Sequence, residues 1–465
     1  MQRLLGQIAE LDAALRQRDA LIEEQAQTLR LYAKRIEELE KEIAALKNGG
    51  NGAKPPPPDW VKPNTHVTAK APPGQGAAKK RKKRQHNFTW TRREPTRTVE
   101  HSCDACPDCG RRLSGGWEHS RRQIVELPPV VVDVVDHVVI ARHCGVCGKD
   151  CVPKVDLREQ AVGRSHYGHR LVSLIAYLRT VCRLPKQPLQ ELLKVLFGLD
   201  LSRGAISEVL HGVAKQGLGV YAELVVELQN SDYVHADETG WREDGQNGYV
   251  WSFSTDRVRY FVYDKSRGHQ VPEAVLGERF RGVLVSDFYS GYHYYGGLHQ
   301  RCWVHLLRDV RQLKERYPTD GVLSWAKKLR DLYDRAKAFS SECPKQRQAA
   351  RLDFQAQLLE LAVPYRDACL PQSVLAKRLI QFEAELFTFV EHPQVPSENN
   401  AAERSVRPRV IARKISGGTR SSKGSQTMAV LASLFETWRL RATNGLEACR
   451  QMLIDSQKQP AKATG

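Results

Sequence analysis

The sequence predicts a multidomain α+β protein, and three patterns lead to this prediction. Residues 1–47 carry a seven-residue apolar repeat, which is typical of a coiled coil. Two Cys-x-x-Cys-Gly motifs, at 106–110 and 144–148, indicate a metal-binding ribbon. From residue 231 the pattern changes to short β-branched and aromatic runs typical of strands, and acidic residues follow two of these runs.

The composition favours a nucleic-acid-binding protein. The chain has 465 residues and a net charge of +18, which is typical of a polyanion binder. Half of that net charge lies in residues 51–100, which contain 12 basic and 3 acidic residues. No run approaches the roughly 20 apolar residues of a membrane span, and there is no signal-peptide pattern. We therefore expect a bacterial cytoplasmic, nucleoid-associated protein.

The first 48 residues are predicted to form a coiled coil that joins copies of the chain into a homo-oligomer. Twelve of the fourteen seam positions are apolar or Tyr, and only Arg18 and Gln25 interrupt the seam. The alternative is an amphipathic helix packed against its own protein.

Residues 49–98 are rich in Pro, Gly and Lys, which predicts an extended, disordered linker. The linker contains six consecutive cations: Lys79, Lys80, Arg81, Lys82, Lys83 and Arg84. Such a run is often only a solvated tract. Because Trp90, Arg92 and Arg93 follow closely, we favour an arm that contacts the DNA backbone without reading its sequence.

Residues 99–155 are predicted to form a zinc ribbon. The four motif thiolates are the expected ligands of one structural Zn²⁺: Cys106, Cys109, Cys144 and Cys147. A glycine after each pair permits the backbone to turn under the metal. The apolar alternation between the motifs predicts strands, and Cys103 and Cys151 remain as spare thiols. An odd, clustered set of cysteines favours metal binding over disulfides.

Residues 156–230 are predicted to be helical and to include a helix-turn-helix. Gly198 marks the turn, Ser202 caps the second helix, and we expect Arg203, Ser207 and His211 to face outward from it toward DNA. An ordinary helical hairpin is an alternative of comparable weight.

Residues 231–302 are predicted to form the first part of a ribonuclease H-like core: three strands, a helix and a fourth strand. Asp237 and Asp287 follow the first and fourth strands. A helical insertion (303–396), the second part of the core (397–446) and a C-terminal tail (447–465) complete the chain.

A third acid, Glu403, begins a later helix, and a row of cations follows it. Two strand-end carboxylates and one helix carboxylate can hold a pair of Mg²⁺ or Mn²⁺ ions for in-line displacement at a phosphodiester. Glu238, next to Asp237, is an alternative ligand. The cations that we expect along the phosphate backbone are Arg404, Arg407, Arg409, Arg413, Lys414, Arg420 and Lys423.

The order of these features resembles the IS66 family of insertion-sequence transposases, over nearly the whole chain. Four motifs carry the resemblance after the coiled coil, ribbon and helical segment. They are Asp-Glu-Thr at 237–239, Ser-Asp-Phe-Tyr-Ser-Gly-Tyr at 286–292, Cys-Trp-Val-His at 302–305 and Asn-Asn-Ala-Ala-Glu-Arg at 399–404.

The resemblance implies a DDE transposase with a ribonuclease H-like catalytic domain and two Mg²⁺ ions. Asp237 and Asp287 match the first two catalytic acids, and Glu403 matches the third, with Glu398 as its rival. Either Asn399 or Asn400 could support Glu403 from the same helix face. The Cys-x-x-His element at 302–305 also occurs in other DDE groups, and we interpret it here as packing.

One departure from the family concerns the segment after the last motif. Many relatives carry Arg-Lys-Asn-Trp, whereas this chain follows Arg413 and Lys414 with a Gly-rich loop. The resemblance also implies that the partners are the terminal inverted repeats of an element, target DNA and accessory proteins of the same element.

The expected mechanism is water-mediated nicking of the element end, followed by attack of the freed 3′-OH on target DNA, without a covalent enzyme intermediate. Two alternatives remain. A zinc-containing DNA-binding regulator would use only the N-terminal half, and a nuclease of the same fold would cleave without joining.

Overall fold

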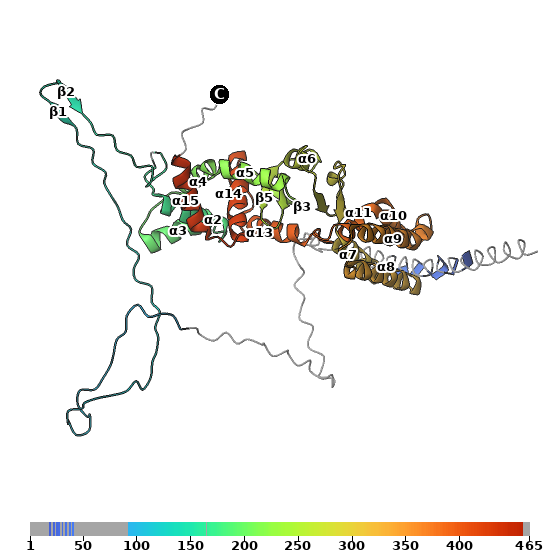
Figure 1. Ribbon diagram of the computed structural model, residues 1–465, viewed down its shortest axis with the longest axis horizontal. Helices are drawn as coiled ribbons and strands as arrows, with labels where there is room; N and C mark the ends of the chain where they lie inside the picture. The colour runs from blue at the N-terminus through green and yellow to red at the C-terminus, as the bar shows by residue number, and fades with distance from the viewer. Residues whose placement is uncertain are drawn as a thin grey trace, which may run out of the picture. The chain divides into compact units, whose positions relative to one another are not determined.

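The computed structural model describes residues 92–163 and 165–458 and, between residues 18 and 40, a series of helical positions (Figure 1). Arg18 and Gln25 are among these helical positions. Most of the predicted coiled coil and the cations at 79–84 lie outside the described residues. Contacts divide the chain into two compact units, Ile43–Val131 and Val132–Gly465 with Met1–Glu42. No described helix combines the length and the apolar character that a lipid bilayer requires.

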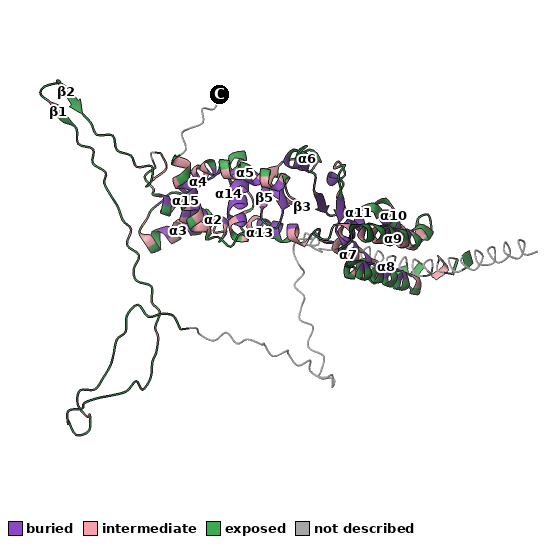
Figure 2. Ribbon diagram, in the orientation of Figure 1, coloured by how far each residue is buried: buried purple, intermediate pink, exposed green. Residues whose placement is uncertain are grey.

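The segment between the two cysteine motifs does not form the strands that its alternation predicts. Residues 113–141 have no regular secondary structure, and Figure 2 shows this stretch exposed along its length. Val131 and Val134 are 88% and 82% exposed. A strand needs a neighbour for its backbone hydrogen bonds, and no strand pairs with this segment among the described residues. Only a short antiparallel hairpin forms, from β1 (Arg142–Cys144) and β2 (Lys149–Cys151).

The predicted helix-turn-helix segment does contain two helices joined by a turn. The helices of this region are α2 (His169–Thr180), α3 (Lys186–Phe197), α4 (Arg203–Gln216) and α5 (Leu218–Gln229). Gly198 ends α3 with a left-handed φ of 65°. The Ser202 hydroxyl accepts a hydrogen bond from the backbone N–H of Ala205 at 3.1 Å and so caps α4.

A five-stranded mixed sheet follows. Its elements are β3 (Tyr233–Glu243), β4 (Gln246–Ser254), β5 (Arg259–Asp264), α6 (Gln270–Leu276), β6 (Val283–Ser286), η1 (Ser290–Tyr292) and β7 (His299–Arg301). The strands are ordered β5-β4-β3-β6-β7. β3, β4 and β5 are antiparallel neighbours, whereas β3, β6 and β7 run parallel. The predicted sequence of three strands, a helix and a fourth strand is confirmed, and β7 was not predicted.

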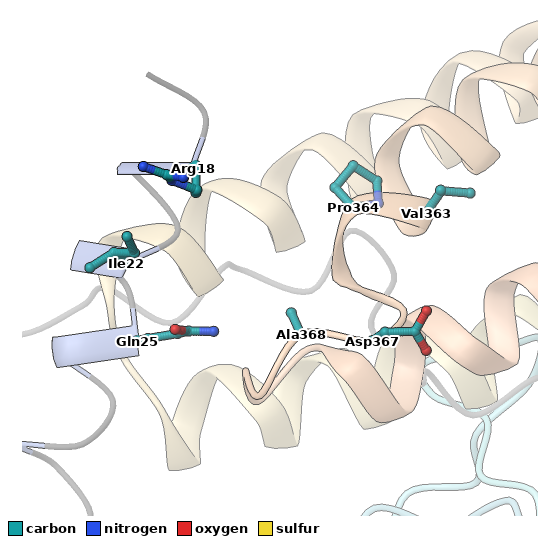
Figure 3. A pocket seen from close by; sticks show the side chains of 7 residues that line it. All are labelled: Arg18, Ile22, Gln25, Val363, Pro364, Asp367 and Ala368. Carbon is teal, nitrogen blue, oxygen red and sulfur yellow. The ribbon is translucent and has the colours of Figure 1, made fainter. Parts of the chain in front are cut away.

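Helices fill the predicted insertion and have their own apolar core. They are α7 (Trp303–Arg316), α8 (Asp320–Ala338), α9 (Pro344–Ala362), α10 (Ser373–Gln381), α11 (Glu383–Leu386) and α12 (Thr388–Glu391), with η2 (Val363–Tyr365) after α9. Trp303, Trp325 and Phe387 are almost fully buried in this core. Figure 3 shows Val363 and Asp367 of the insertion in a pocket that contains none of the candidate acids.

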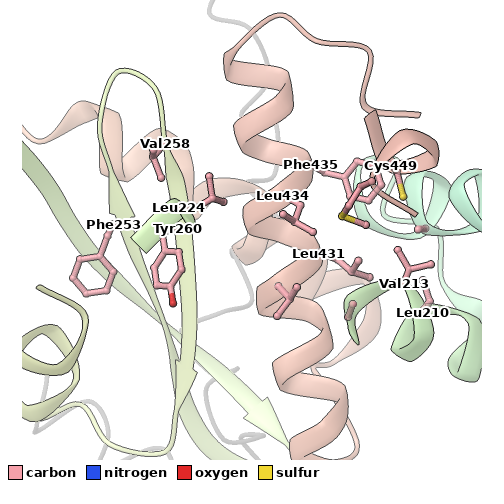
Figure 4. Close-up of a cluster of buried hydrophobic side chains, with 14 of the residues drawn as sticks. Leu210, Val213, Leu224, Phe253, Val258, Tyr260, Leu431, Leu434, Phe435 and Cys449 are labelled. Atoms are coloured by element: carbon pink, nitrogen blue, oxygen red, sulfur yellow. The ribbon is translucent and has the colours of Figure 1, made fainter. Parts of the chain in front are cut away.

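The main core is shared by the sheet, by helices that precede it (α2 to α5) and by helices near the C-terminal end of the described residues. The last three helices are α13 (Asn400–Ser416), α14 (Ser422–Leu440) and α15 (Gly445–Lys458). In Figure 4, Leu434 of α14 lies between Tyr260 of the sheet and Val213 of α4. The helices within 156–230 thus share this core with the sheet. Within the predicted C-terminal tail, α15 buries Cys449 and Leu453 in the same core.

The Gly-rich loop after α13 forms backbone hydrogen bonds with the β3–β4 hairpin. The backbone N–H of Thr419 donates to the carbonyl of Arg242 at 2.9 Å, and the N–H of Asp244 donates to the carbonyl of Thr419 at 2.8 Å. Gly418 has a φ of 110°, and a Cβ at this position would lie 2.1 Å from the Arg242 oxygen. Glycine is therefore required at this close approach.

Candidate active site

Asp237 lies within β3 and not at the end of a strand, as the sequence had suggested. β3 continues to Glu243, and Asp237 pairs with Ser252 of β4. The parallel pairing of β3 with β6 ends at His235 opposite Val285. Asp237 therefore lies just beyond the parallel ladder, at the edge where β6 also ends.

Burial and neighbouring carboxylates raise the pKa of Asp237 to about 8. The acids that contribute to this rise are Glu238, Asp287 and Glu403. One carboxylate oxygen, Oδ1, accepts the backbone N–H of Glu238 at 2.9 Å. The second oxygen accepts no hydrogen bond from the described residues. Asp287 and Glu403 thus both lie near enough to Asp237 to disfavour its ionised form.

Asp287 directly follows β6, as predicted. Its Oδ1 accepts the backbone N–H of Tyr289 at 2.9 Å, which fixes one oxygen. Its main-chain carbonyl accepts hydrogen bonds from Arg301 at 2.8 Å and from the Ser286 hydroxyl at 2.9 Å. The side chain and the main chain of Asp287 are thus both held by neighbours.

Glu403 lies in the first turn of α13. Its Oε1 is buried and accepts no hydrogen bond, and it lies 3.4 Å from His305 Nε2 and 3.6 Å from an Arg308 nitrogen. Glu403 is also among the groups that raise the pKa of Asp237. These observations favour Glu403 over Glu398 as the helix acid of the site.

Asn399 joins the segments that carry the acids. Its side chain, 1% exposed, donates from Nδ2 to the Ala236 carbonyl at 2.7 Å and contacts His235 Nδ1 through Oδ1 at 2.9 Å. Its backbone N–H donates to Cys302 Sγ at 3.1 Å. The backbone N–H of Cys302 in turn donates to the Ser286 carbonyl at 2.9 Å. The main-chain carbonyl of Asn399 also accepts the N–H of Glu403 at 3.2 Å, in the first turn of α13.

The Cys-x-x-His element has two roles. Cys302 is fully buried and packs as predicted. His305 does not only pack, because its ring reaches Glu403. The interpretation of the whole element as packing is therefore corrected for His305, whose buried Nδ1 has no hydrogen-bond partner.

Glu238 is a poor candidate for a metal ligand. Its Oε1 accepts hydrogen bonds from Arg267 at 3.0 and 2.7 Å, and its Oε2 accepts the Tyr292 hydroxyl at 2.7 Å. The side chain is only 3% exposed. Both carboxylate oxygens therefore already have protein donors.

The predicted metal clusters are not assembled among the residues that the structure describes. No three His, Cys, Asp or Glu side chains there lie close enough to share one ion. Like charges repel in the absence of a cation, and Glu403 lies instead beside His305 and Arg308. The donor chemistry nevertheless fits a hard divalent cation, because Asp237 and Asp287 each keep one oxygen without a protein donor.

Each Cys-x-x-Cys-Gly motif folds as a tight turn. The N–H of Gly110 donates to the Cys106 carbonyl at 2.9 Å, and the N–H of Gly148 donates to the Cys144 carbonyl at the same distance. Both glycines have positive φ, 69° and 59°, as predicted. Backbone N–H donors lower the pKa of Cys106 and Cys144, which favours the thiolate.

The cations on α13 divide between solvent and core. Arg404, Arg407 and Lys414 are exposed, and Arg413 donates to the Gly240 carbonyl. Arg409 is only 2% exposed and pairs with Glu436 of α14. Its prediction as a DNA contact is therefore wrong, because no phosphate can reach a guanidinium inside the core. Arg420 and Lys423 follow on the exposed surface.

The outward face predicted for α4 is only partly correct. Arg203 is exposed at the start of the helix. His211, however, contacts the Thr427 hydroxyl of α14 at 2.7 Å, and Ser207 accepts a hydrogen bond from Lys186 at 2.6 Å. These two side chains face other parts of the same protein.

The chain is similar to known proteins. The family model described as "Transposase IS66 family" matches residues 164–427. A curated relative, "Uncharacterized protein y4jO" of Sinorhizobium fredii (strain NBRC 101917 / NGR234), is 30% identical over 159 residues, which cover 33% of this chain and 47% of the relative. "Uncharacterized protein y4qI" of the same organism is 21% identical over 318 residues, 61% of this chain and 58% of the relative. The chain thus spans about half the length of the curated relatives it matches.

The buried acids predict a pH-dependent cost to stability. Because the pKa of Asp237 rises from 3.8 to about 8 on folding, the metal-free protein should lose stability as pH increases through this window. Asp237→Asn removes this loss, so its melting temperature in EDTA should exceed that of the wild type by several degrees at pH 8 and by less at pH 5. Asp244→Asn, at an exposed turn of the same hairpin, is the control. A difference that does not grow with pH would contradict this account.

Proposed function

Because this chain belongs to the IS66 transposase family, we propose that it is a DNA transposase that binds insertion-sequence ends and catalyses metal-dependent strand cleavage and strand transfer. The proposal is supported by the positions of Asp237 on β3, Asp287 directly after β6 and Glu403 in the first turn of α13, because Asp287 and Glu403 both contribute to the raised pKa of Asp237. An exposed row of cations begins next to the third acid.

The sheet supports a ribonuclease H-like catalytic core. Three antiparallel strands followed by parallel strands on the other side of β3 are the arrangement expected of that fold. In such a sheet the first strand is central, and its acid lies next to the end of the neighbouring parallel strand. Asp237 on β3 and Asp287 after β6 have these positions.

Asp237, Asp287 and Glu403 are the residues that would hold Mg²⁺ or Mn²⁺, two ions per active site. When bound, these ions activate the attacking oxygen and stabilise the leaving oxygen of an in-line displacement. The backbone donors to Oδ1 of both aspartates leave Oδ2 for the cation. Asn399 keeps the start of α13, which carries Glu403, against β3, which carries Asp237. No Ser or Tyr nucleophile is required.

The exposed stripe of α13 is the proposed track for the DNA backbone. Arg404, Arg407 and Lys414 recur at intervals of three and seven residues, which places them on one side of the helix. The stripe begins directly after Glu403, so a phosphate bound there would lie near the acids. Arg203 and the linker cations at 79–84, outside the described residues, are proposed as further sequence-independent contacts.

The N-terminal regions are proposed to assemble and support the enzyme. Cys106, Cys109, Cys144 and Cys147 would hold one structural Zn²⁺, since each pair already forms the required turn. Residues 1–48 would join copies of the chain, so that two element ends are held together. We place this activity in the bacterial cytoplasm on nucleoid DNA, with accessory proteins of the same element as possible partners.

The function predicts metal-dependent cleavage and joining of a labelled duplex that carries an element end. Asp287→Asn and Glu403→Gln should lower both rates by roughly two orders of magnitude or more while binding is retained. Glu398→Gln is the matched control and should remain active.

Other outcomes of this assay would identify the rival functions. Cleavage without joining would indicate a nuclease of the same fold. Binding without any metal-dependent product, with accessory proteins supplied, would indicate a regulator or an inactive copy.

The α13 stripe predicts a salt-dependent contribution to DNA binding. Arg407→Gln should weaken binding and reduce the slope of log K against log salt by about 1. Arg450→Gln on α15 removes an equal charge from a side chain that is 42% exposed, and it should leave the slope unchanged. Equal slopes for Arg407→Gln and the wild type would exclude this phosphate contact.

The paired motifs predict one zinc ion per chain in the purified full-length protein. Cys147→Ser should lose the zinc, as measured by elemental analysis, because a four-thiolate site needs every ligand. Cys343→Ser, an exposed cysteine before α9, should retain it. Full zinc content in Cys147→Ser would contradict the ribbon.

A further inference from the structure

Arg301 connects the second acid to the helical insertion. It is 1% exposed at the end of β7. One guanidinium nitrogen, Nη1, donates to the main-chain carbonyl of Asp287 at 2.8 Å and to the Ser286 hydroxyl at 3.1 Å. Nε donates to Glu385 Oε2, on α11, at 2.6 Å. A single buried side chain thus contacts both the end of β6 and the insertion.

The insertion holds Arg301 from several sides. The Phe382 ring centre lies 4.8 Å from the guanidinium carbon. The Leu386 carbonyl accepts hydrogen bonds from Gln300 at 3.1 Å and from the Trp303 indole at 2.6 Å. The Thr388 hydroxyl donates to the His299 carbonyl at 2.6 Å. Residues 382–388 therefore pack along β7 and hold the Arg301 side chain in its buried position.

Glu385 is the acid that balances the buried charge of Arg301. His299 also lies near Glu385, with its Nδ1 at 3.5 Å, and its Nε2 contacts the Ser286 hydroxyl at 2.9 Å. Burial and the charge of Arg301 lower the pKa of His299 well below its usual value, so this ring is neutral. Removal of the Glu385 charge would leave the guanidinium buried and unpaired, which is strongly unfavourable.

The position of Asp287 depends on this contact. Its carbonyl is held by Arg301, and its Oδ1 is held by the N–H of Tyr289. A displaced guanidinium would free the Asp287 peptide to rotate, and the free Oδ2 would move with it. Groups that orient metal ligands in this way typically change metal affinity by 10–100-fold when they are removed.

We propose that Arg301 and Glu385 are positioning residues for Asp287, so that the helical insertion is a necessary part of the active site. This inference rests on the function proposed above, because it concerns the same carboxylate. It assigns to the insertion a direct role in holding the second acid.

The test is the affinity of the full-length protein for Mn²⁺, measured by electron paramagnetic resonance of the free ion, together with the melting temperature. Glu385→Gln is compared with Glu391→Gln. Glu391 is a matched control, since it also belongs to the insertion and pairs with a partly buried arginine, but that arginine is Arg351 and not Arg301. If Glu385→Gln does not fold, Glu385→Asp, which keeps the charge but shortens its reach, replaces it.

We expect Glu385→Gln to weaken Mn²⁺ binding by about 10-fold and Glu391→Gln to leave it within about 2-fold, although both lower the melting temperature. Equal Mn²⁺ affinities in these two variants, with binding lost in Asp287→Asn, would overturn the positioning role and leave the proposed function intact. If the wild type binds no Mn²⁺, or Asp287→Asn still binds it, the proposed function fails and the inference fails with it.

Discussion

The site depends on the buried amide of Asn399. This side chain bonds to the Ala236 carbonyl, immediately before Asp237, and it occupies the position from which α13 starts. Without it, a buried backbone carbonyl and the His235 ring would lose their partner, at a cost of about 1–3 kcal/mol for each unsatisfied group. The same residue contacts Cys302, whose N–H reaches the end of β6. One short network thus holds together segments that are far apart in the sequence.

The hydrogen bonds of Asn399 act against the electrostatic repulsion between the acids of the site. Burial and the nearby charges of Glu238, Asp287 and Glu403 raise the pKa of Asp237, so in the absence of a cation ionisation of Asp237 destabilises the fold. His305 and Arg308 of α7 offset part of this cost at Glu403. A protein that concentrates negative charge in this way and holds it with buried hydrogen bonds is suited to bind a cation at that place.

α13 has a buried side that packs in the core and an exposed side that carries the proposed DNA contacts. Its buried side places Ser405 against Ser252 of β4 and Arg409 against Glu436 of α14. Its exposed side presents Arg404 and Arg407. Because both sides belong to one rigid element, a DNA backbone on the exposed stripe would have a fixed position relative to Glu403. The insertion contacts the site at two places, through His305 and Arg308 beside Glu403 and through Glu385, which pairs with Arg301 behind Asp287.

The sequence by itself determined the local features. The order of β3, β4, β5, α6 and β6, the Ser202 cap, the glycine turns of the cysteine motifs and the place of Asp287 after a strand all follow from propensity and periodicity over a few residues. Only the tertiary structure decided which cations are buried, that α15 joins the core, that residues 113–141 form no strand, and that Arg301 supports Asp287. Each of these depends on a partner far away in the chain, such as Glu436 for Arg409, and no local pattern specifies that partner.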